Sequence, residues 1–201
     1  DNGILLIADE VQCGNCRSGR YYASEYWKEA GAAPDIIATA KSLGGGVPIS
    51  AITAREEIMD SVPVGTIGGT YCGNPLACAS ALKVMDIMLE EDYAGKAEEI
   101  GKKATIFFSG LKEKYEEAGD VRGLGSMLGV EFVKTKAEKE PNGELVSKVI
   151  QNALQMGLML ENAGTHGNVI RFLVPLCVTD EQLEKGFEIF ETALVKAKSD
   201  K

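Results

Sequence analysis

Short, continuous apolar runs alternate with turn-rich segments in the first half of the chain. Residues 4–8 form one apolar run that ends in an acidic pair, and residues 36–38 form a second run that leads into Lys41. Runs of this length are typical of strands buried on both faces of a parallel sheet. Because open α/β sheets bind ligands at strand ends, we expect a ligand site after both runs.

Helix signals accompany these two strands. Residues 21–30 have a helical pattern that Gly31 ends. Asn74 followed by Pro75 is a strong helix start, since asparagine caps the first turn and proline is preset for the first helical position. We expect that helix to continue to about Leu89.

From about residue 93 the pattern changes to that of a smaller α+β domain. Thr179 and Gln182 have the spacing of a capping box, which predicts a last helix to about residue 198. The other expected elements are helices over 96–118 and 144–156 and strands over 127–133 and 169–174. We therefore expect two domains, residues 1–93 and 94–201.

Composition narrows the class of protein. The 201 residues are 45% apolar, which excludes disorder as the main state, and the formal net charge of -9 argues against nucleic-acid binding. No apolar run reaches 18 residues and no secretory signal is visible, so we expect no membrane span. Five cysteines, an odd number, indicate reduced thiols and a cytoplasmic protein.

Four residues carry candidate chemistry, each with a plainer alternative. A desolvated Lys41 amine would be a nucleophile, but a surface lysine is the commoner case. Asp9 could pair with a cationic ring nitrogen or cap a turn. Thr70, after two glycines, could bind a phosphate or belong to a plain turn. Arg171, inside an apolar strand, could bind a carboxylate or pair with a surface glutamate.

Other motifs are weaker. Cys13 and Cys16 form a C-x-x-C pair that could be a redox pair or half of a zinc site, but no second pair exists. We expect no metal. The glycine-rich segment 123–129 misses the dinucleotide-binding spacing by one residue and precedes a strand instead of following one.

Taken together, five segments resemble class III pyridoxal-phosphate-dependent aminotransferases, and the resemblance covers essentially the whole chain. The segments are 6–12 (LIADEVQ), 34–46 (PDIIATAKSLGGG), 68–77 (GGTYCGNPLA), 121–125 (VRGLG) and 168–176 (NVIRFLVPL). The last is most like 4-aminobutyrate aminotransferases. The resemblance implies the α/β fold of fold-type I transferases, with part of the cofactor-binding large domain to residue 93 and the small C-terminal domain after it.

The resemblance also assigns roles in cofactor chemistry. It implies that Lys41 forms the Schiff base with pyridoxal 5′-phosphate and later moves the proton, and that Asp9 pairs with the protonated ring nitrogen. Val11 would pack against the ring face and Gln12 would hydrogen-bond the 3′-oxygen of the ring. Thr70 would bind the cofactor phosphate across a homodimer interface.

For the substrates, the resemblance implies that Arg171 binds a carboxylate. The expected reaction is a ping-pong transfer of an amino group from an ω-amino acid, foremost 4-aminobutyrate, to 2-oxoglutarate. An ornithine- or acetylornithine-type activity is the alternative within the family.

The sequence departs from the family pattern in length and at one turn. It has about half the family length and lacks the N-terminal half, so a truncated or split-gene fragment that is inactive alone is a further alternative. A split enzyme would need an N-terminal-half partner. Cys16 stands where the family usually has glycine, which predicts strain in that turn.

Overall fold

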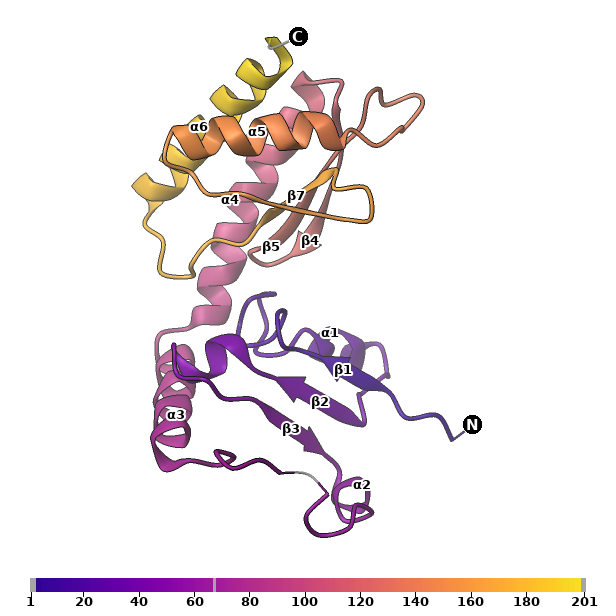
Figure 1. Ribbon diagram of the computed structural model, residues 1–201, viewed down its shortest axis with the longest axis vertical. Helices are drawn as coiled ribbons and strands as arrows, with labels where there is room; N and C mark the ends of the chain where they lie inside the picture. Colours follow the sequence, from indigo (N-terminus) through magenta and orange to yellow (C-terminus); the bar gives the residue numbers. More distant parts are fainter. Residues whose placement is uncertain (1–2, 67, 200–201) are drawn as a thin grey trace. The chain divides into compact units, whose positions relative to one another are not determined.

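The computed structural model describes residues 3–66 and 68–199. The chain divides into two compact units, residues 1–97 and residues 98–201, which are described separately (Figure 1). None of the described helices is both long enough and apolar enough to cross a membrane.

Unit 1 (residues 1–97) contains a three-stranded sheet in the order β1-β2-β3. The parallel pair is β1 (Ile7–Asp9) and β2 (Ile36–Thr39), and β3 (Ala51–Ala54) is antiparallel to β2. The helices of the unit are α1 (Ser24–Glu29), the 3-10 helix η1 (Lys41–Gly44), α2 (Glu56–Met59) and α3 (Pro75–Glu90). The expected parallel pairing of the two apolar runs is therefore confirmed.

The expectation that the first apolar run is buried on both faces is wrong for this chain. Only Ala8 is buried, whereas the side chains of Ile4 and Ile7 are 84% and 61% exposed. The physical reason is that β1 is an edge strand of the described sheet, paired on one side only. Apolar side chains that a neighbouring layer would cover are left open to solvent.

Two helix starts can be compared with their sequence signals. The Asn74 cap is confirmed, because its Oδ1 accepts a hydrogen bond from the Ala77 amide at 2.9 Å. The helix expected over 21–30 is shorter, since α1 begins only at Ser24. The amides of Ala23 and Ser24 donate to the Glu10 carboxylate, a contact from outside the segment that sets where α1 begins.

Unit 2 (residues 98–201) is built on an antiparallel sheet in the order β4-β5-β7-β6. Its strands are β4 (Ala118–Leu124), β5 (Met127–Phe132), β6 (Glu161–Ala163) and β7 (Val169–Phe172). Its helices are α4 (Tyr93–Lys114), which begins in unit 1, α5 (Gly143–Gln155) and α6 (Asp180–Ser199). The predicted capping box is confirmed, with Thr179 and Gln182 bonded to each other's amides at 3.1 and 3.3 Å.

The helix expected over 96–118 was predicted to end at residue 118, and this position is wrong. Helix α4 ends at Lys114, and residues 118–124 form the unpredicted strand β4. Ala118 pairs with Phe132 and Leu124 with Met127, so β4 is held by its neighbour β5. Tertiary pairing of this kind outweighs the local helical pattern.

Aromatic side chains fill the core of unit 2. Phe108 from α4 lies 5.6 Å from Phe172 of β7 and 5.2 Å from Phe190 of α6, measured between ring centroids. Phe132 of β5 is fully buried against Phe190. The helices are thereby fixed to the sheet that carries Arg171.

Candidate functional site

The carboxyl ends of β1 and β2 lie side by side in unit 1. Asp9, the last residue of β1, pairs with Ala38 of β2. The next amide, that of Glu10, donates to the Ala38 carbonyl at 2.8 Å. Lys41 follows the end of β2 by two residues. The structure therefore brings Asp9 and Lys41 to neighbouring strand ends, where open α/β sheets bind ligands.

Lys41 is the first residue of η1, and its side chain is exposed. Within residues 3–66 and 68–199, its amine forms no ion pair or hydrogen bond. Its backbone has a φ of 51°, in the left-handed region that costs a residue with a Cβ about 1 kcal/mol. The plainer alternative, a surface lysine, thus describes Lys41 here, and the desolvated amine expected from the sequence is not found.

Helix α3 holds η1 in place through the glycines that follow Lys41. The Ser80 hydroxyl donates to the Gly44 carbonyl at 2.8 Å. Gly45 has a φ of 56°, and a Cβ there would lie 2.7 Å from Cγ2 of Val84. Glycine is therefore needed for both the backbone conformation and the close approach of α3.

Asp9 is exposed, and one of its carboxylate oxygens is already positioned. Its Oδ1 accepts a hydrogen bond from the Val11 amide at 3.1 Å. The second oxygen has no partner in the described part of the chain, so it can accept a hydrogen bond from a cationic donor. Val11 and Gln12 are half-buried in the turn that follows.

Sequence reasoning missed the buried Glu10 carboxylate. Glu10 is 1% exposed. Its Oε1 accepts from the Ser24 amide at 2.6 Å, and its Oε2 accepts from the Ala23 amide at 3.1 Å and from the Cys13 thiol at 3.0 Å. Ala8 and Glu10 are buried and Asp9 between them is exposed, so the period-2 alternation of a strand, continued one residue past β1, was the signal for an inward Glu10.

Asn15 is a second buried polar residue at these strand ends that the sequence pattern did not reveal. Its Nδ2 donates to the Ala40 carbonyl at 3.2 Å and to the Thr39 hydroxyl at 3.4 Å. Asn15 lies in the loop after β1, whereas its acceptors lie at the end of β2. The Asp9 segment is therefore bonded to the residue just before Lys41.

The two C-x-x-C thiols are poorly suited to redox or metal chemistry. Desolvation by burial raises the pKa of Cys13 and of Cys16 from near 9 to about 11 in each case, which suppresses the reactive thiolate. All five cysteines are free. Among the described residues, no group of three or more His, Cys, Asp or Glu side chains could hold a metal ion.

Thr70 and Arg171 belong to elements other than the strand ends that carry Asp9 and Lys41. Thr70 is exposed in a turn of unit 1. Arg171 lies in β7 of unit 2, where its NH2 group forms an ion pair with Glu161 of the neighbouring β6. The plainer alternative, an arginine paired with a glutamate, thus describes Arg171 here, although β7 is an inner strand.

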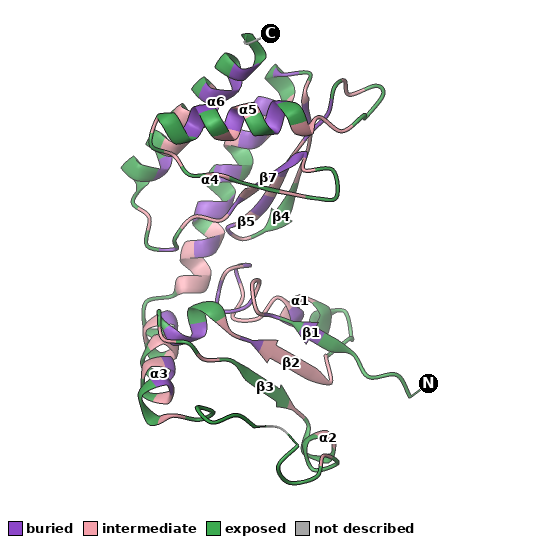
Figure 2. Ribbon diagram, in the orientation of Figure 1, coloured by how far each residue is buried: buried purple, intermediate pink, exposed green. Residues whose placement is uncertain are grey.

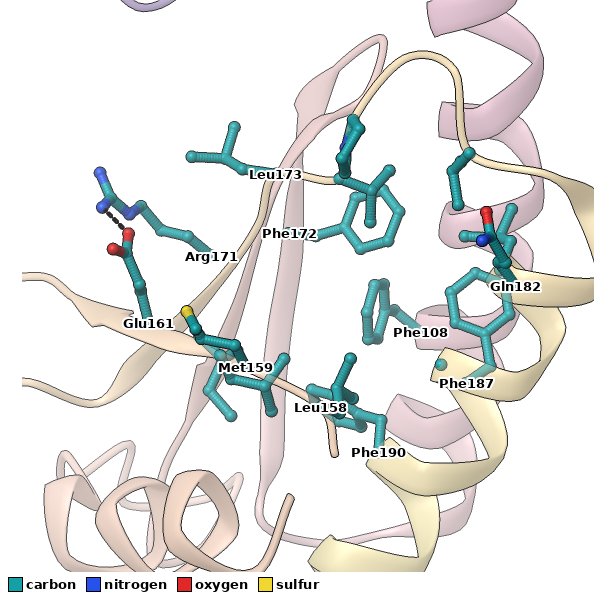
Figure 3. A pocket seen from close by; sticks show the side chains of 17 residues that line it. Phe108, Leu158, Met159, Glu161, Arg171, Phe172, Leu173, Gln182, Phe187 and Phe190 are labelled. Atoms are coloured by element: carbon teal, nitrogen blue, oxygen red, sulfur yellow. Dashed lines mark hydrogen bonds and ion pairs between the residues drawn. The ribbon is translucent and has the colours of Figure 1, made fainter. Parts of the chain in front are cut away.

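A cavity of about 560 Å³ lies beside Arg171 in unit 2. Figure 3 shows apolar side chains, among them Leu158, Phe172 and Phe187, gathered around it. Arg171 extends toward Glu161 and away from this aromatic group (Figure 3). Its Nε is buried and, in the part of the chain described, has no hydrogen-bond partner.

The chain belongs to the class-III aminotransferase family, whose model matches residues 1–194. It is 45% identical over 188 residues to 5-aminovalerate aminotransferase DavT of Pseudomonas aeruginosa, covering 94% of this chain and 43% of the relative. It is 41% identical to 4-aminobutyrate aminotransferase GabT of Escherichia coli, covering 98% and 46%. The chain thus spans less than half the length of these relatives.

Solved structures agree with the fold. The chain is similar to the ornithine aminotransferase of Toxoplasma gondii, with a TM-score of 0.85 and 32% identity over 98% of this chain and 45% of that one. A PLP-bound amine transaminase from an uncultivated Pseudomonas species gives a TM-score of 0.86 and 33% identity over 97% and 45%. The expected α/β fold of fold-type I transferases is confirmed.

Proposed function

We propose that this chain is the C-terminal part of a pyridoxal-phosphate-dependent aminotransferase that acts on an ω-amino acid, foremost 4-aminobutyrate, with 2-oxoglutarate as acceptor. The observation that carries the proposal is that Asp9 and Lys41 stand at adjoining strand ends, with a Lys41 amine that has no partner among the described residues. Residues 1–93 then belong to the cofactor-binding large domain and residues 94–201 to the small domain. The names of DavT and GabT support a substrate with a terminal amine.

The donor set of unit 1 fits pyridoxal 5′-phosphate. Lys41 offers an amine to the aldehyde, and the free oxygen of Asp9 suits a protonated ring nitrogen. Val11 and Gln12 follow Asp9 and supply a ring contact and a donor for the 3′-oxygen, while the Thr70 hydroxyl supplies a phosphate donor across the homodimer interface. When bound, the cofactor supplies an electron sink for the carbon that loses its proton.

Lys41 and Arg171 have separate tasks in this proposal. The Lys41 amine, once released, takes the proton from the amino-bearing carbon and returns a proton in the second half of the transfer. Arg171 binds a substrate carboxylate through its guanidinium, with Glu161 as the group that the carboxylate must replace. The same arginine suits both an ω-amino acid and 2-oxoglutarate, since each carries a carboxylate.

We further propose a cytoplasmic homodimer for the complete enzyme, in keeping with five free cysteines. Inactivity of this chain alone is favoured by one observation, the exposed apolar side chains of Ile7 on the edge strand β1 and of Ile4 just before it. An N-terminal-half polypeptide is the partner that would cover such a surface and complete the enzyme. An ornithine-type donor is the alternative within the same chemistry.

The test is the absorbance spectrum of the purified chain with pyridoxal phosphate. We expect a visible band that survives dialysis and is absent in Lys41→Ala. Lys28→Ala, which removes an exposed lysine of α1, is the matched control and should keep the band. A band that remains in Lys41→Ala would refute the assignment of the reactive amine.

Substrate choice needs a second measurement. With 2-oxoglutarate as acceptor, we expect glutamate to form faster from 4-aminobutyrate than from ornithine or acetylornithine. If neither band nor glutamate appears, the same assays with an added N-terminal-half polypeptide distinguish a split enzyme from an inactive fragment. Activity only in the mixture would establish the split enzyme.

A further inference from the structure

Asn15 and Cys16, in the loop after β1, and Lys41, just after β2, have left-handed backbone conformations. Asn15 has a φ of 53° and Lys41 has a φ of 51°. Asparagine adopts this conformation with little cost, whereas lysine does so only when its surroundings hold it there. The contacts around the peptide group that precedes Lys41 therefore determine the backbone conformation of the lysine and the direction of its side chain.

Asn15 supplies the long-range contact to that peptide group. Its side chain is buried, with 2% of the residue exposed, and its Nδ2 donates to the Ala40 carbonyl at 3.2 Å. The same carbonyl accepts the Leu43 amide at 3.1 Å, the first hydrogen bond of η1. One oxygen thus joins the Asn15 side chain to the turn that begins with Lys41.

The backbone beside Asn15 is itself anchored to Glu10, the residue that follows β1. The amide of Gly14 donates to the Glu10 carbonyl at 3.0 Å, and a Cβ at Gly14 would come within 2.7 Å of that oxygen. The buried Glu10 carboxylate binds the far end of the loop at Ala23 and Ser24. The loop is closed at both ends, so Asn15 has little freedom to move away from Ala40.

We propose that Asn15 is a positioning residue for Lys41, which fixes the Ala40–Lys41 peptide group and so holds the lysine amine beside Asp9. This inference rests on the proposed function, because it concerns the amine that would bind pyridoxal phosphate. Asn15 touches neither cofactor nor substrate in this assignment; it acts through the backbone of Lys41.

Two substitutions separate the hydrogen bond from the backbone conformation. Asn15→Gly keeps the left-handed conformation accessible but removes the donor. Asn15→Asp keeps the shape and places a carboxylate oxygen against the Ala40 carbonyl, which can only accept. Asn168→Asp is the matched control, because Asn168 is also a buried asparagine and donates to a carbonyl, that of Phe132 at 3.0 Å in unit 2.

The first readout needs no cofactor. Amide hydrogen exchange of the full chain should accelerate about tenfold at Leu43 and Gly45 in both Asn15 variants, since η1 loses its outer support. The Asn168 control should leave these two amides unchanged. Unchanged exchange at Leu43 and Gly45 in the Asn15 variants would overturn the inference.

The second readout is the Lys41-dependent band with pyridoxal phosphate. We expect about tenfold faster loss of the band on dialysis in both variants, because a displaced amine holds the cofactor less well. The pH at which the band is half-converted should shift in both variants, since a displaced Lys41 nitrogen has different neighbours. If the Leu43 and Gly45 amides exchange faster but the band survives dialysis as before and keeps its pH midpoint, Asn15 has a merely structural role and the inference is overturned.

The outcome for the parent chain keeps the two proposals apart. A parent band that disappears in Lys41→Ala supports the proposed function, whatever the Asn15 variants do. If the parent chain has no such band even with an added N-terminal-half polypeptide, the proposed function fails, whereas amide exchange at Leu43 and Gly45 still shows whether Asn15 supports η1. When the parent chain shows the band, the dialysis and pH measurements on the Asn15 variants test the inference.

Discussion

The two sheets of this chain are buried to very different degrees. In unit 2, strand β5 alternates buried and half-buried residues and strand β7 is mostly buried. The aromatic cluster covers both strands. In unit 1, β3 is almost entirely exposed and β1 buries only its central residue. Figure 2 shows the same contrast between β3 and β5.

The buried material also differs in kind. The core of unit 2 is apolar, with Phe132, Val130 and Ile170 almost inaccessible to water. The best-buried groups of unit 1 include polar side chains, Glu10 and Asn15 foremost, in the loop after β1. Unit 2 therefore has the packing of a self-sufficient domain, whereas unit 1 concentrates its order around the strand ends where the candidate site lies.

Matched deletions in the two sheets should give the largest contrast. Ile170 of β7 is 1% exposed, and Ile52 of β3 is 53% exposed. Ile170→Ala should lower the free energy of unfolding by about 3 kcal/mol, because it leaves a cavity in a packed core. Ile52→Ala should change it by about 0.5 kcal/mol or less, since the side chain is already hydrated.

Chemical denaturation followed by circular dichroism measures both values. A loss for Ile52→Ala as large as that for Ile170→Ala would show that another surface covers β3 in solution. The contrast drawn between the sheets would then be wrong. A self-associated chain is one such case, and repeating the titration at several protein concentrations would reveal it.

A smaller effect is expected from the polar centre of unit 1. Glu10→Gln replaces an oxygen that accepts amide hydrogens by an NH2 group, so at least one buried donor loses its partner. We expect a loss of about 2 kcal/mol in the free energy of unfolding. The fluorescence of Trp27, the only tryptophan of the chain and a residue of α1, follows this unit specifically.

Glu25→Gln is the control for this substitution. Glu25 also accepts a backbone amide, that of Tyr22 at 2.8 Å, but it lies in a half-exposed position and glutamine can accept the same bond. Its effect should stay below about 0.5 kcal/mol. Equal losses in the two variants would mean that burial at Glu10 adds nothing and that the loop is held by other contacts.

Local signals in the sequence predicted much of the fold. The Asn74 cap, the Thr179 capping box and the parallel pairing of β1 with β2 depend on short patterns, and each is found in the structure. Strand β4 depends on hydrogen bonds to β5, and the exposure of Ile7 depends on what covers the sheet edge. Neither is encoded in the residues of the segment itself.

The candidate site divides in the same way. The positions of Asp9 and Lys41 after apolar runs predicted neighbouring strand ends, because parallel pairing brings such ends together. The contact of Asn15 with Ala40 joins residues 25 positions apart, and an asparagine in a loop has no local feature that identifies its acceptor. The ion pair of Arg171 with Glu161 likewise depends on the register between β6 and β7.

The smallest expected effect is the response of unit 1 to alkaline pH. Burial raises the pKa of the Cys13 and Cys16 thiols to about 11, above their ordinary value near 9. Above pH 9 the unfolded chain releases these protons while the folded chain retains them, so the stability that the thiols contribute falls as the pH rises toward 11. Because solvent partly screens the two groups, we expect about 1 kcal/mol at pH 10.

Trp27-monitored unfolding at pH 8 and pH 10 measures this effect in the parent chain and in the Cys13→Ala/Cys16→Ala double variant. The other groups that titrate over this range are common to both proteins, so the difference between their pH slopes isolates the two thiols. The double variant should lose less stability than the parent between these pH values. Equal slopes would mean that both thiols are already open to water, and that the loop after β1 is not the ordered centre of unit 1.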